Sequence, residues 1–183
     1  MELYIMSRLD HIAYRTKDKD KTAKFFQQFF GYKIADSFPI VFEDGSQAQC
    51  IALEPQEKNY SSLHCFGVNG TEYHLAPEIF VSDGDNDSIV GKWVVENGGG
   101  IHHKAYQFNN EISLRMQKSL MESYDIKFAS DVIYCQEEDL WQVFTKPLDM
   151  LGGIILELIV RGPNNPGFCK ASVKTLMESI NDN

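Results

Sequence analysis

A duplication within the chain constrains its fold more than any other feature of the sequence. Two short stretches, residues 9–14 and residues 101–106, lie about half a chain length apart. Aligning His11 with His103 also aligns an alanine two positions later and a tyrosine three positions later. Self-similarity at such a spacing is typical of two structurally equivalent units. We therefore expect two similar halves, with His11 and His103 at equivalent positions.

The pattern of apolar and turn-forming residues predicts the same order of elements, β-α-β-β-β, in both halves. A polar linker at residues 82–88 separates them. The first half is expected to contain strand 7–16, helix 20–30 ended by Gly31, strand 32–42 interrupted by Pro39, strand 47–53, and one or two strands within 63–81. The second is expected to contain a leading helix 89–97, strand 101–108, helix 110–124, strands 126–134, 140–145 and 154–160, and a closing helix at 170–180.

This order predicts an α+β fold of two tandem βαβββ modules, whose curved mixed sheet encloses a cup. The expected modules are residues 1–82 and 99–183, with residues 83–98 as a linker that carries the short helix. A cup lined by equivalent strands of both halves is a natural ligand site. The first helix is expected to pack Phe25, Phe26, Phe29 and Phe30 on the sheet, and the second to group Ile112, Met116, Leu120 and Met121 on one side.

Composition narrows the range of partners. The 183 residues carry a formal net charge of −9, which argues against nucleic acid and anionic membrane surfaces but not against a small anionic substrate. No run of apolar residues is long enough to span a membrane, and the first ten residues do not resemble a signal peptide. The four cysteines show no CxxC spacing. We therefore expect a cytoplasmic protein with reduced, mostly buried cysteines.

Three residues on expected strands form a candidate metal site. His11 and His103 begin the two halves, and Glu157 is the only charge among residues 154–160. A buried carboxylate is costly unless it is paired or bound to metal. Two imidazoles and one carboxylate are the ligand set of non-haem Fe(II), and Zn, Mn, Co or Ni could also bind. Strand alternation places His102 on the opposite face from His103, and the repeat favours His103 because Asp10 is the counterpart of His102.

The duplicated β-α-β-β-β order with His11, His103 and Glu157 resembles the vicinal oxygen chelate superfamily, which includes glyoxalase I, methylmalonyl-CoA epimerase, extradiol dioxygenases and 4-hydroxyphenylpyruvate dioxygenase. The resemblance covers nearly the whole chain and implies that these three residues bind the metal. Residues 140–147, 154–161 and 167–168 are similar to the C-terminal catalytic half of the hydroxyphenylpyruvate dioxygenase. That similarity implies Fe(II), a chelating 2-oxo acid substrate, a pocket lined by Gln142 and Phe144, and a C-terminal gate that includes Phe168.

The epimerase is the second relative, because residues 87–106 resemble both families. Its fourth metal ligand, a glutamine, would fall on Tyr73, and its acid/base glutamate would fall near Cys50. Both departures weigh against proton transfer next to a thioester, which needs a positioned base on each face. His64 and His74 lack the support of the repeat, so we expect them to be structural or to lie outside the ligand set.

The sequence therefore favours an Fe(II) dioxygenase-like oxidoreductase that acts on a small 2-oxo acid or a similar chelating molecule. An isomerase or lyase of the epimerase or glyoxalase type is the second hypothesis. A non-catalytic ligand-binding or resistance protein is the third, and the presence of all three ligands counts against it. Relatives pair their modules within or between chains, so both a monomer and a homodimer are compatible with the resemblance.

Overall fold

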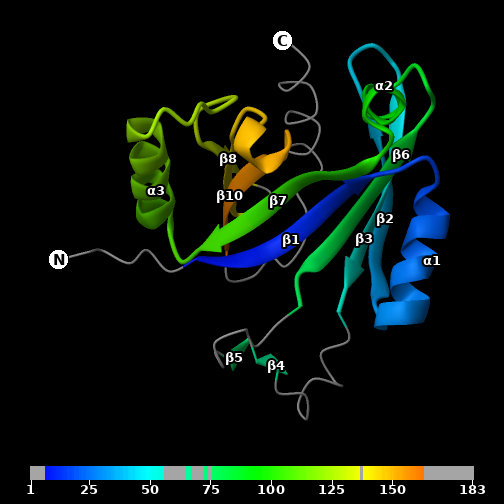
Figure 1. Cartoon of the computed structure of the whole chain (residues 1–183), viewed down its shortest axis with the longest axis horizontal. Coiled ribbons are helices and arrows are strands. Elements are labelled where there is room, and N and C mark those ends of the chain that lie inside the picture. The colour runs from blue at the N-terminus through cyan, green and yellow to red at the C-terminus, as the bar shows by residue number, and fades with distance from the viewer. Residues whose placement is uncertain (1–6, 56–64, 67–71, 74–75, 137, 163–183) are drawn as a thin grey trace.

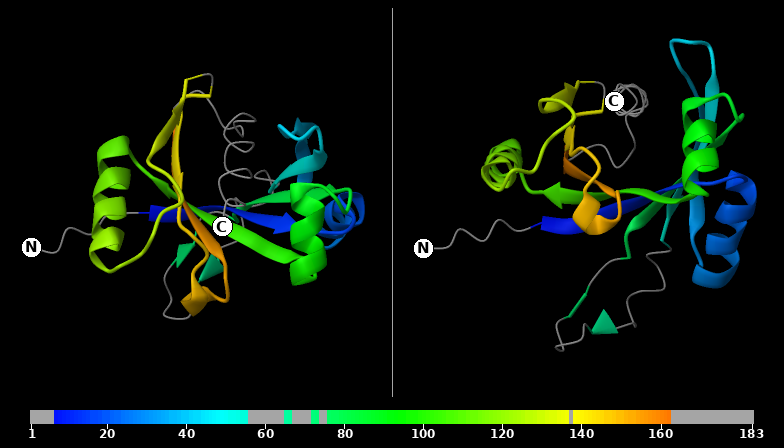
Figure 2. Two further views of the ribbon diagram at one scale, coloured as in Figure 1. Left: turned by 90° about the horizontal axis from the view of Figure 1, so that it is seen from above. Right: turned by 45° about the horizontal axis from the view of Figure 1, so that its top comes forward.

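The two central strands of the molecule are β1 and β7, the first strands of the two halves. In this computed structural model, which describes residues 7–55, 65–66, 72–73, 76–136 and 138–162, they pair antiparallel in the middle of an eight-stranded sheet. Figures 1 and 2 show α1 and α3 at opposite ends of the molecule, with β1 and β7 running between them. Phe168, which was predicted to belong to a C-terminal gate, and the helix predicted at 170–180 lie outside the described residues.

The elements follow the predicted order, except that three strands, not one or two, lie between residues 65 and 84, and the strand expected at 126–134 is short. In the first half they are β1 (Ser7–Arg15), α1 (Lys19–Phe30), β2 (Lys33–Val41), β3 (Gln47–Glu54), the short pair β4 (Cys65–Phe66) and β5 (Glu72–Tyr73), and β6 (Glu78–Gly84). Then come α2 (Ile89–Asn97), β7 (Gly100–Phe108), α3 (Glu111–Ser123), β8 (Ile133–Cys135), β9 (Leu140–Phe144), a 3-10 turn (Asp149–Leu151) and β10 (Ile155–Arg161). The strand expected at 126–134 is therefore mostly irregular.

The order of strands across the sheet is symmetric about its centre. It reads β2-β3-β6-β1-β7-β10-β9-β8, so each strand of one half has a counterpart at the same distance from the middle. The pairs are also alike, because β1 with β6 and β7 with β10 are the parallel neighbours. The predicted α+β fold with a curved mixed sheet is confirmed. The module boundaries at residues 82 and 99 stay a prediction.

Helices cover the two faces of this sheet differently. On one face, α1 packs against alternate residues of β1, such as Ile12 and Tyr14, and α3 packs against β7 and β10. On the other face α2 covers the first half, where Val90 and Val94 contact Ala13 in a core cluster. His11 lies on this second face, two residues before Ala13, because side chains alternate along a strand. The second face therefore holds the candidate site.

The predicted packing faces of the two long helices are partly wrong. Three of the four α1 phenylalanines are exposed, Phe29 by 70%, and only Phe26 packs against the core. On α3 the fully buried residue is Leu114. Each helical residue turns by about 100°, so positions two residues before and after Leu114 point away from the sheet. The exposed apolar residues of α3 are Ile112, Met116 and Leu120.

A pair of leucine substitutions tests this face of α3. Leu114→Ala is expected to lower the free energy of unfolding by about 2–5 kcal/mol, because it leaves a cavity in the core. Leu120→Ala makes the same chemical change at a side chain that is 49% exposed, and is expected to cost less than about 0.5 kcal/mol. Urea unfolding followed by circular dichroism measures both. Equal losses for the two variants would contradict the packing described here.

The cysteines also differ from expectation. Cys50 is a free, buried thiol, whereas Cys135 is disulfide-bonded. The expectation of reduced cysteines is therefore wrong for Cys135. No helix in the part of the chain that the structure describes is long and apolar enough to cross a membrane.

Candidate metal centre

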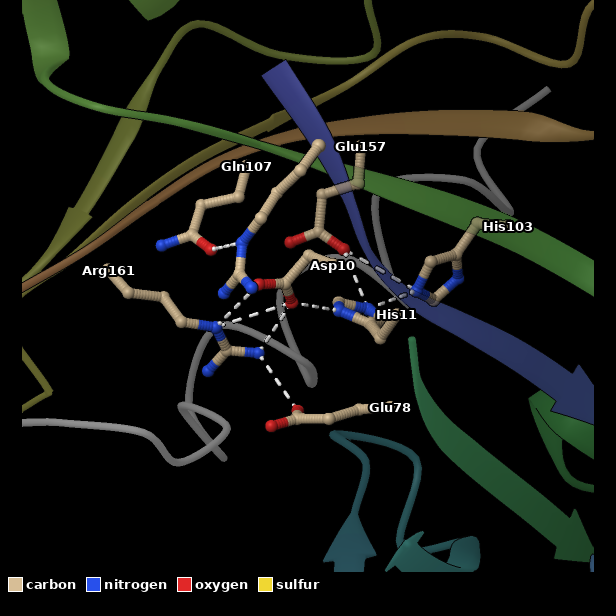
Figure 3. A network of polar contacts seen from close by, with 8 residues as sticks. Asp10, His11, Glu78, His103, Gln107, Glu157 and Arg161 are labelled. Carbon is tan, nitrogen blue, oxygen red and sulfur yellow. Dashed lines mark hydrogen bonds and ion pairs between the residues drawn. The ribbon is translucent and has the colours of Figure 1, made fainter. Parts of the chain in front are cut away.

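Strand pairing brings the three predicted ligands together. His11 pairs with Ala105, and His103 pairs with Ala13, so the two histidines lie diagonally across the β1–β7 pair. Glu157 of β10 pairs with the same Ala105 from its other side, so the small Ala105 lies between His11 and Glu157 in one row across the sheet. The ligand atoms all lie within 4.8 Å of one another, and the three residues are buried. Figure 3 shows the three side chains, from three strands, pointing toward a common centre.

The distances within the centre suit a shared cation. The Nε2 atoms of His11 and His103 are 3.3 Å apart. Oε2 of Glu157 lies 3.2 Å from Nε2 of His11 and 3.5 Å from Nε2 of His103. Two imidazoles and a carboxylate are ligands that Fe(II), Zn and related divalent metals accept. A site with three protein ligands leaves further coordination positions for water or substrate.

Two β-bulges place an extra polar residue beside each histidine. The register of β1 against β7 shifts between Leu9 and His11, which leaves Asp10 as an extra residue. It shifts again opposite Ala13 and Tyr14, which leaves His102 as the extra residue of β7. A bulge re-aims side chains that alternation would send to the opposite face. Asp10 and His102 are consequently buried next to the histidines that follow them.

The residue before each candidate ligand contacts the Nδ1 atom of that ligand. Oδ1 of Asp10 lies 2.8 Å from Nδ1 of His11. Nδ1 of His102 lies 2.9 Å from Nδ1 of His103. Such a partner fixes the tautomer and the orientation of a metal-binding imidazole, and leaves Nε2 free to coordinate. The duplication therefore repeats the outer partner of each histidine as well as the histidine itself.

Arg161, at the end of β10, ties the two halves together behind His11. Its guanidinium reaches Asp10 through Nη2 at 2.7 Å and through Nε at 3.0 Å. Nη2 also lies 3.3 Å from Oε2 of Glu78, which comes from β6 (Figure 3). Paired guanidinium–carboxylate contacts are geometrically specific. Asp10 is thereby held in place to orient His11.

The charges around the centre favour one proton on His11. Burial lowers the pKa of His11, but Glu157 and Asp10 outweigh it and raise that pKa to about 9. Burial and the neighbouring His11 hold the pKa of His103 well below its usual value. Burial raises the pKa of Asp10, but hydrogen bonds from His11 and Arg161 bring it well below its usual range. In the ion-free chain, His11 is therefore a cation between two carboxylates, and a divalent cation would take the place of that proton.

Two predicted pocket residues lie on the same face as the ligands. Phe144 pairs with Glu157, and Gln142 pairs with Ile159, two residues further along β10. The ring of Phe144 meets the ring of His103 edge to face at 5.8 Å. Gln142 is 4% exposed, and its Nε2 has no hydrogen-bond partner among the described residues. Phe144 therefore lies next to a candidate ligand, and Gln142 lies further along β9 on the same face; their role in a substrate pocket stays a prediction.

The strand register corrects the expected position of a fourth ligand. Ala13 is the counterpart of Ala105, and Phe80 pairs with Ala13 in the way that Glu157 pairs with Ala105. Phe80, and not Tyr73, is thus the counterpart of Glu157 in the first half. Tyr73 belongs to the separate β4–β5 pair. His64 and His74 lie outside the described residues.

Cys50 lies in the first-half core and not at the candidate centre. It pairs with Ser82 and packs in the cluster that α2 covers. Burial raises the pKa of its thiol to about 12. A thiol in that state is a poor nucleophile and a poor base at neutral pH.

Sequence reasoning missed the partners that support the histidines. Alternation turned Asp10 and His102 away from the cup, because it assumed regular pairing. The signal was present in the repeat, since the residue before each aligned histidine has a polar side chain that can form a hydrogen bond. No local pattern indicated Arg161, which lies far from Asp10 in the sequence.

One family model and several solved structures match this chain. The model described as Glyoxalase/Bleomycin resistance protein/Dioxygenase superfamily matches residues 8–114, which is more than half of the chain. No curated protein matches at a significant level. A mutant of 4-hydroxymandelate synthase from Streptomyces coelicolor superposes with a TM-score of 0.71 and 16% identity, covering 95% of this chain and 53% of the synthase.

Methylmalonyl-CoA epimerases share the fold at similar identity. A selenomethionine form gives a TM-score of 0.57 and 18% identity, covering 84% of this chain and 94% of the epimerase. A variant of the Streptomyces coelicolor epimerase in complex with 2-nitronate-propionyl-CoA gives a TM-score of 0.55 and 20% identity, covering 85% of this chain and 97% of the epimerase. These identities establish likeness of fold. The chain spans about half the length of the synthase and nearly the full length of the epimerases.

Proposed function

This chain belongs to the Glyoxalase/Bleomycin resistance protein/Dioxygenase superfamily, and from this membership we propose that it is a metal-dependent enzyme, an Fe(II) dioxygenase-like oxidoreductase of small 2-oxo acids. The observation that carries the proposal is the convergence of two imidazole nitrogens and one carboxylate oxygen within 4.8 Å. The donor set fits a divalent metal, and each histidine has its Nδ1 atom occupied by a buried neighbour.

The residues around the centre have distinct tasks in this proposal. His11, His103 and Glu157 would hold the metal, which when bound supplies Lewis-acid polarisation of a chelating substrate and, as Fe(II), electrons for the reduction of dioxygen. Asp10 and His102 keep the two imidazoles in the ligating tautomer. Phe144 shields one side of His103 from water, and Gln142 offers a buried amide to the substrate.

The first half of the cup supports an oxidoreductase over an epimerase. An epimerase needs a positioned base on each face of the carbon that it inverts. The counterpart of Glu157 is the buried Phe80, and the candidate base position is the buried Cys50 thiol, whose pKa is raised to about 12. The protonated thiol is no base near neutral pH, and the Phe80 side chain offers the metal no fourth ligand. The isomerase or lyase remains the second candidate because the fold is shared with methylmalonyl-CoA epimerases.

Oxygen uptake separates these functions. We expect the protein, loaded with Fe(II) under anaerobic conditions, to consume dioxygen when a member of a panel of 2-oxo acids is added, and Glu157→Ala to lose this uptake. An oxygen electrode measures the rate. The matched control is Glu54→Ala, which removes an exposed carboxylate at the end of β3.

The contrary outcome is equally specific. If no 2-oxo acid supports uptake while the Co or Ni form exchanges a proton of a thioester or isomerises a hemithioacetal, the protein is an isomerase or lyase. If the ligands bind no metal and small molecules still bind in the cup, it is a non-catalytic binding protein. All three candidate ligands come from one chain, so neither outcome requires a homodimer.

A further inference from the structure

Arg15 is a buried guanidinium that has no hydrogen-bond acceptor among the described residues. It ends β1 on the same face as His11 and Ala13, and it is 1% exposed. Its Nε, Nη1 and Nη2 atoms all lack partners within that part of the chain. Buried charges in proteins are almost always paired, because an unpaired one loses its hydration without compensation. An unpaired buried arginine therefore indicates an anionic ligand.

Among the residues that the structure describes, none supplies a counter-charge to Arg15. The guanidinium lies 5.5 Å from the ring centre of Trp93, a contact that attracts a cation but accepts no conventional hydrogen bonds. Burial lowers the pKa of Arg15 to about 9, so the side chain is still a cation at neutral pH. The nearby Cys50 thiol stays protonated there, because burial raises its pKa to about 12. Within the described part of the chain, the positive charge of Arg15 is thus uncompensated.

His102 adds a second unpartnered donor against the same tryptophan. If Nε2 of His103 binds the metal, its Nδ1 carries the proton, which it donates to Nδ1 of His102 over 2.9 Å. The proton of His102 must then be on its own Nε2, which is buried and has no partner among the described residues. The ring of His102 meets Trp93 edge to face at 5.4 Å. Arg15 and His102 therefore present N–H donors from two neighbouring strands.

We propose that Arg15, with the Nε2–H group of His102, binds a carboxylate of the substrate that is remote from the atoms the metal chelates. This inference rests on the proposed function and narrows its substrate class to short 2-oxo acids with a second carboxylate. Arg15 and His102 both contact Trp93, and His102 in turn contacts His103, so a short chain of contacts links the two donors to the metal centre. The metal centre and the anchor can thus hold the two ends of one small molecule.

Matched pairs of 2-oxo acids test the anchor. Each 2-oxo dicarboxylate of four, five or six carbons is compared with the 2-oxo monocarboxylate of equal length, such as 2-oxoglutarate with 2-oxopentanoate. Binding is measured by calorimetry on the Zn form, which does not turn over with dioxygen. At the best length we expect the dicarboxylate to bind at least about tenfold more tightly, the gain typical of a charged hydrogen bond.

Substitution of Arg15 should remove this preference alone. Arg15→Gln is expected to bind the dicarboxylate at least about tenfold more weakly than the unsubstituted protein does. Its affinity for the monocarboxylate should change by less than about twofold. Arg15→Lys keeps the charge and should retain part of the preference. Arg8→Gln is the matched control, because it makes the same change at an exposed position of the same strand. An equal loss of affinity for both acids, or no loss of affinity for either, would overturn the proposal.

Thermal unfolding distinguishes an anchor from a structural arginine. Removing an unpaired buried charge should leave the Tm of the ligand-free protein unchanged or raise it. If Arg15→Gln lowers the Tm and weakens both acids equally, Arg15 serves packing under Trp93 and the proposal fails.

A metal-free experiment separates this proposal from the function on which it rests. Glutarate has two carboxylates but no oxo group, so it does not need chelation. If the protein binds no metal but glutarate binds in an Arg15-dependent way, the anchor stands and the metal function fails. If the Zn form binds 2-oxo acids without regard to a second carboxylate, the metal function stands and the anchor fails.

Discussion

Replacing His103 by alanine is expected to lower the affinity for Zn²⁺ by more than about 100-fold, beyond the 10–100-fold that loss of an outer partner typically costs. The imidazole is one of three candidate ligands among the described residues, and His102 does not take its place, because the bulge holds the His102 ring against Nδ1 of His103. With His103 gone, two ligands remain on β1 and β10. Competition with a fluorescent chelator measures the affinity.

The adjacent histidine provides the control for this prediction. His102→Ala removes an imidazole from the preceding residue. It should weaken Zn²⁺ binding by no more than about 10–100-fold, because only the contact with Nδ1 of His103 is lost. The order of the two variants is therefore fixed by the bulge. If His102→Ala costs more than His103→Ala, the two histidines have the opposite roles. If neither changes metal binding, the centre is not a metal site.

Removing Asp10 is expected to lower both the stability of the fold and the affinity for metal. Asp10→Ala removes the carboxylate that Nε and Nη2 of Arg161 both contact, and loss of one member of a buried ion pair typically costs about 3–5 kcal/mol. It also removes the acceptor at Nδ1 of His11, so Zn²⁺ should bind about 10–100-fold more weakly. Urea unfolding of the metal-free protein and chelator competition measure the two effects separately.

Glu78 is the matched control for Asp10. It contacts the same guanidinium, but at 3.3 Å and with a side chain that is 30% exposed, so Glu78→Ala should cost less than about 1 kcal/mol. Asp10→Asn retains an oxygen acceptor, so its cost in unfolding free energy should lie between those of Asp10→Ala and Glu78→Ala. A double-mutant cycle of Asp10 and Arg161 gives the coupling directly. Equal costs for Asp10→Ala and Glu78→Ala would contradict the role assigned to Arg161.

Much of the fold follows from local patterns. Residues 89–97 form a helix as predicted, and α1 begins after the Asp18 cap and ends at Gly31, which has a φ of 71°. These features depend on neighbouring residues, because caps and positive-φ positions are decided within one turn. The packing faces of α1 and α3 could not be predicted from local patterns. Both helices carry more apolar residues than their contact with the sheet uses, so periodicity alone could not identify the buried side.

The sequence by itself determined that the chain is a duplication, that its elements follow the order β-α-β-β-β twice, and that His11, His103 and Glu157 are the candidate ligands. Only the tertiary structure decided what surrounds them. The bulges at Asp10 and His102 arise where β1 pairs with β7, and the contact of Arg161 with Asp10 joins β10 to β1. The lack of a hydrogen-bond partner for Arg15 among the described residues likewise appears only in the folded chain. Alternation describes one strand at a time, whereas these features depend on the register between strands, which only the folded sheet defines.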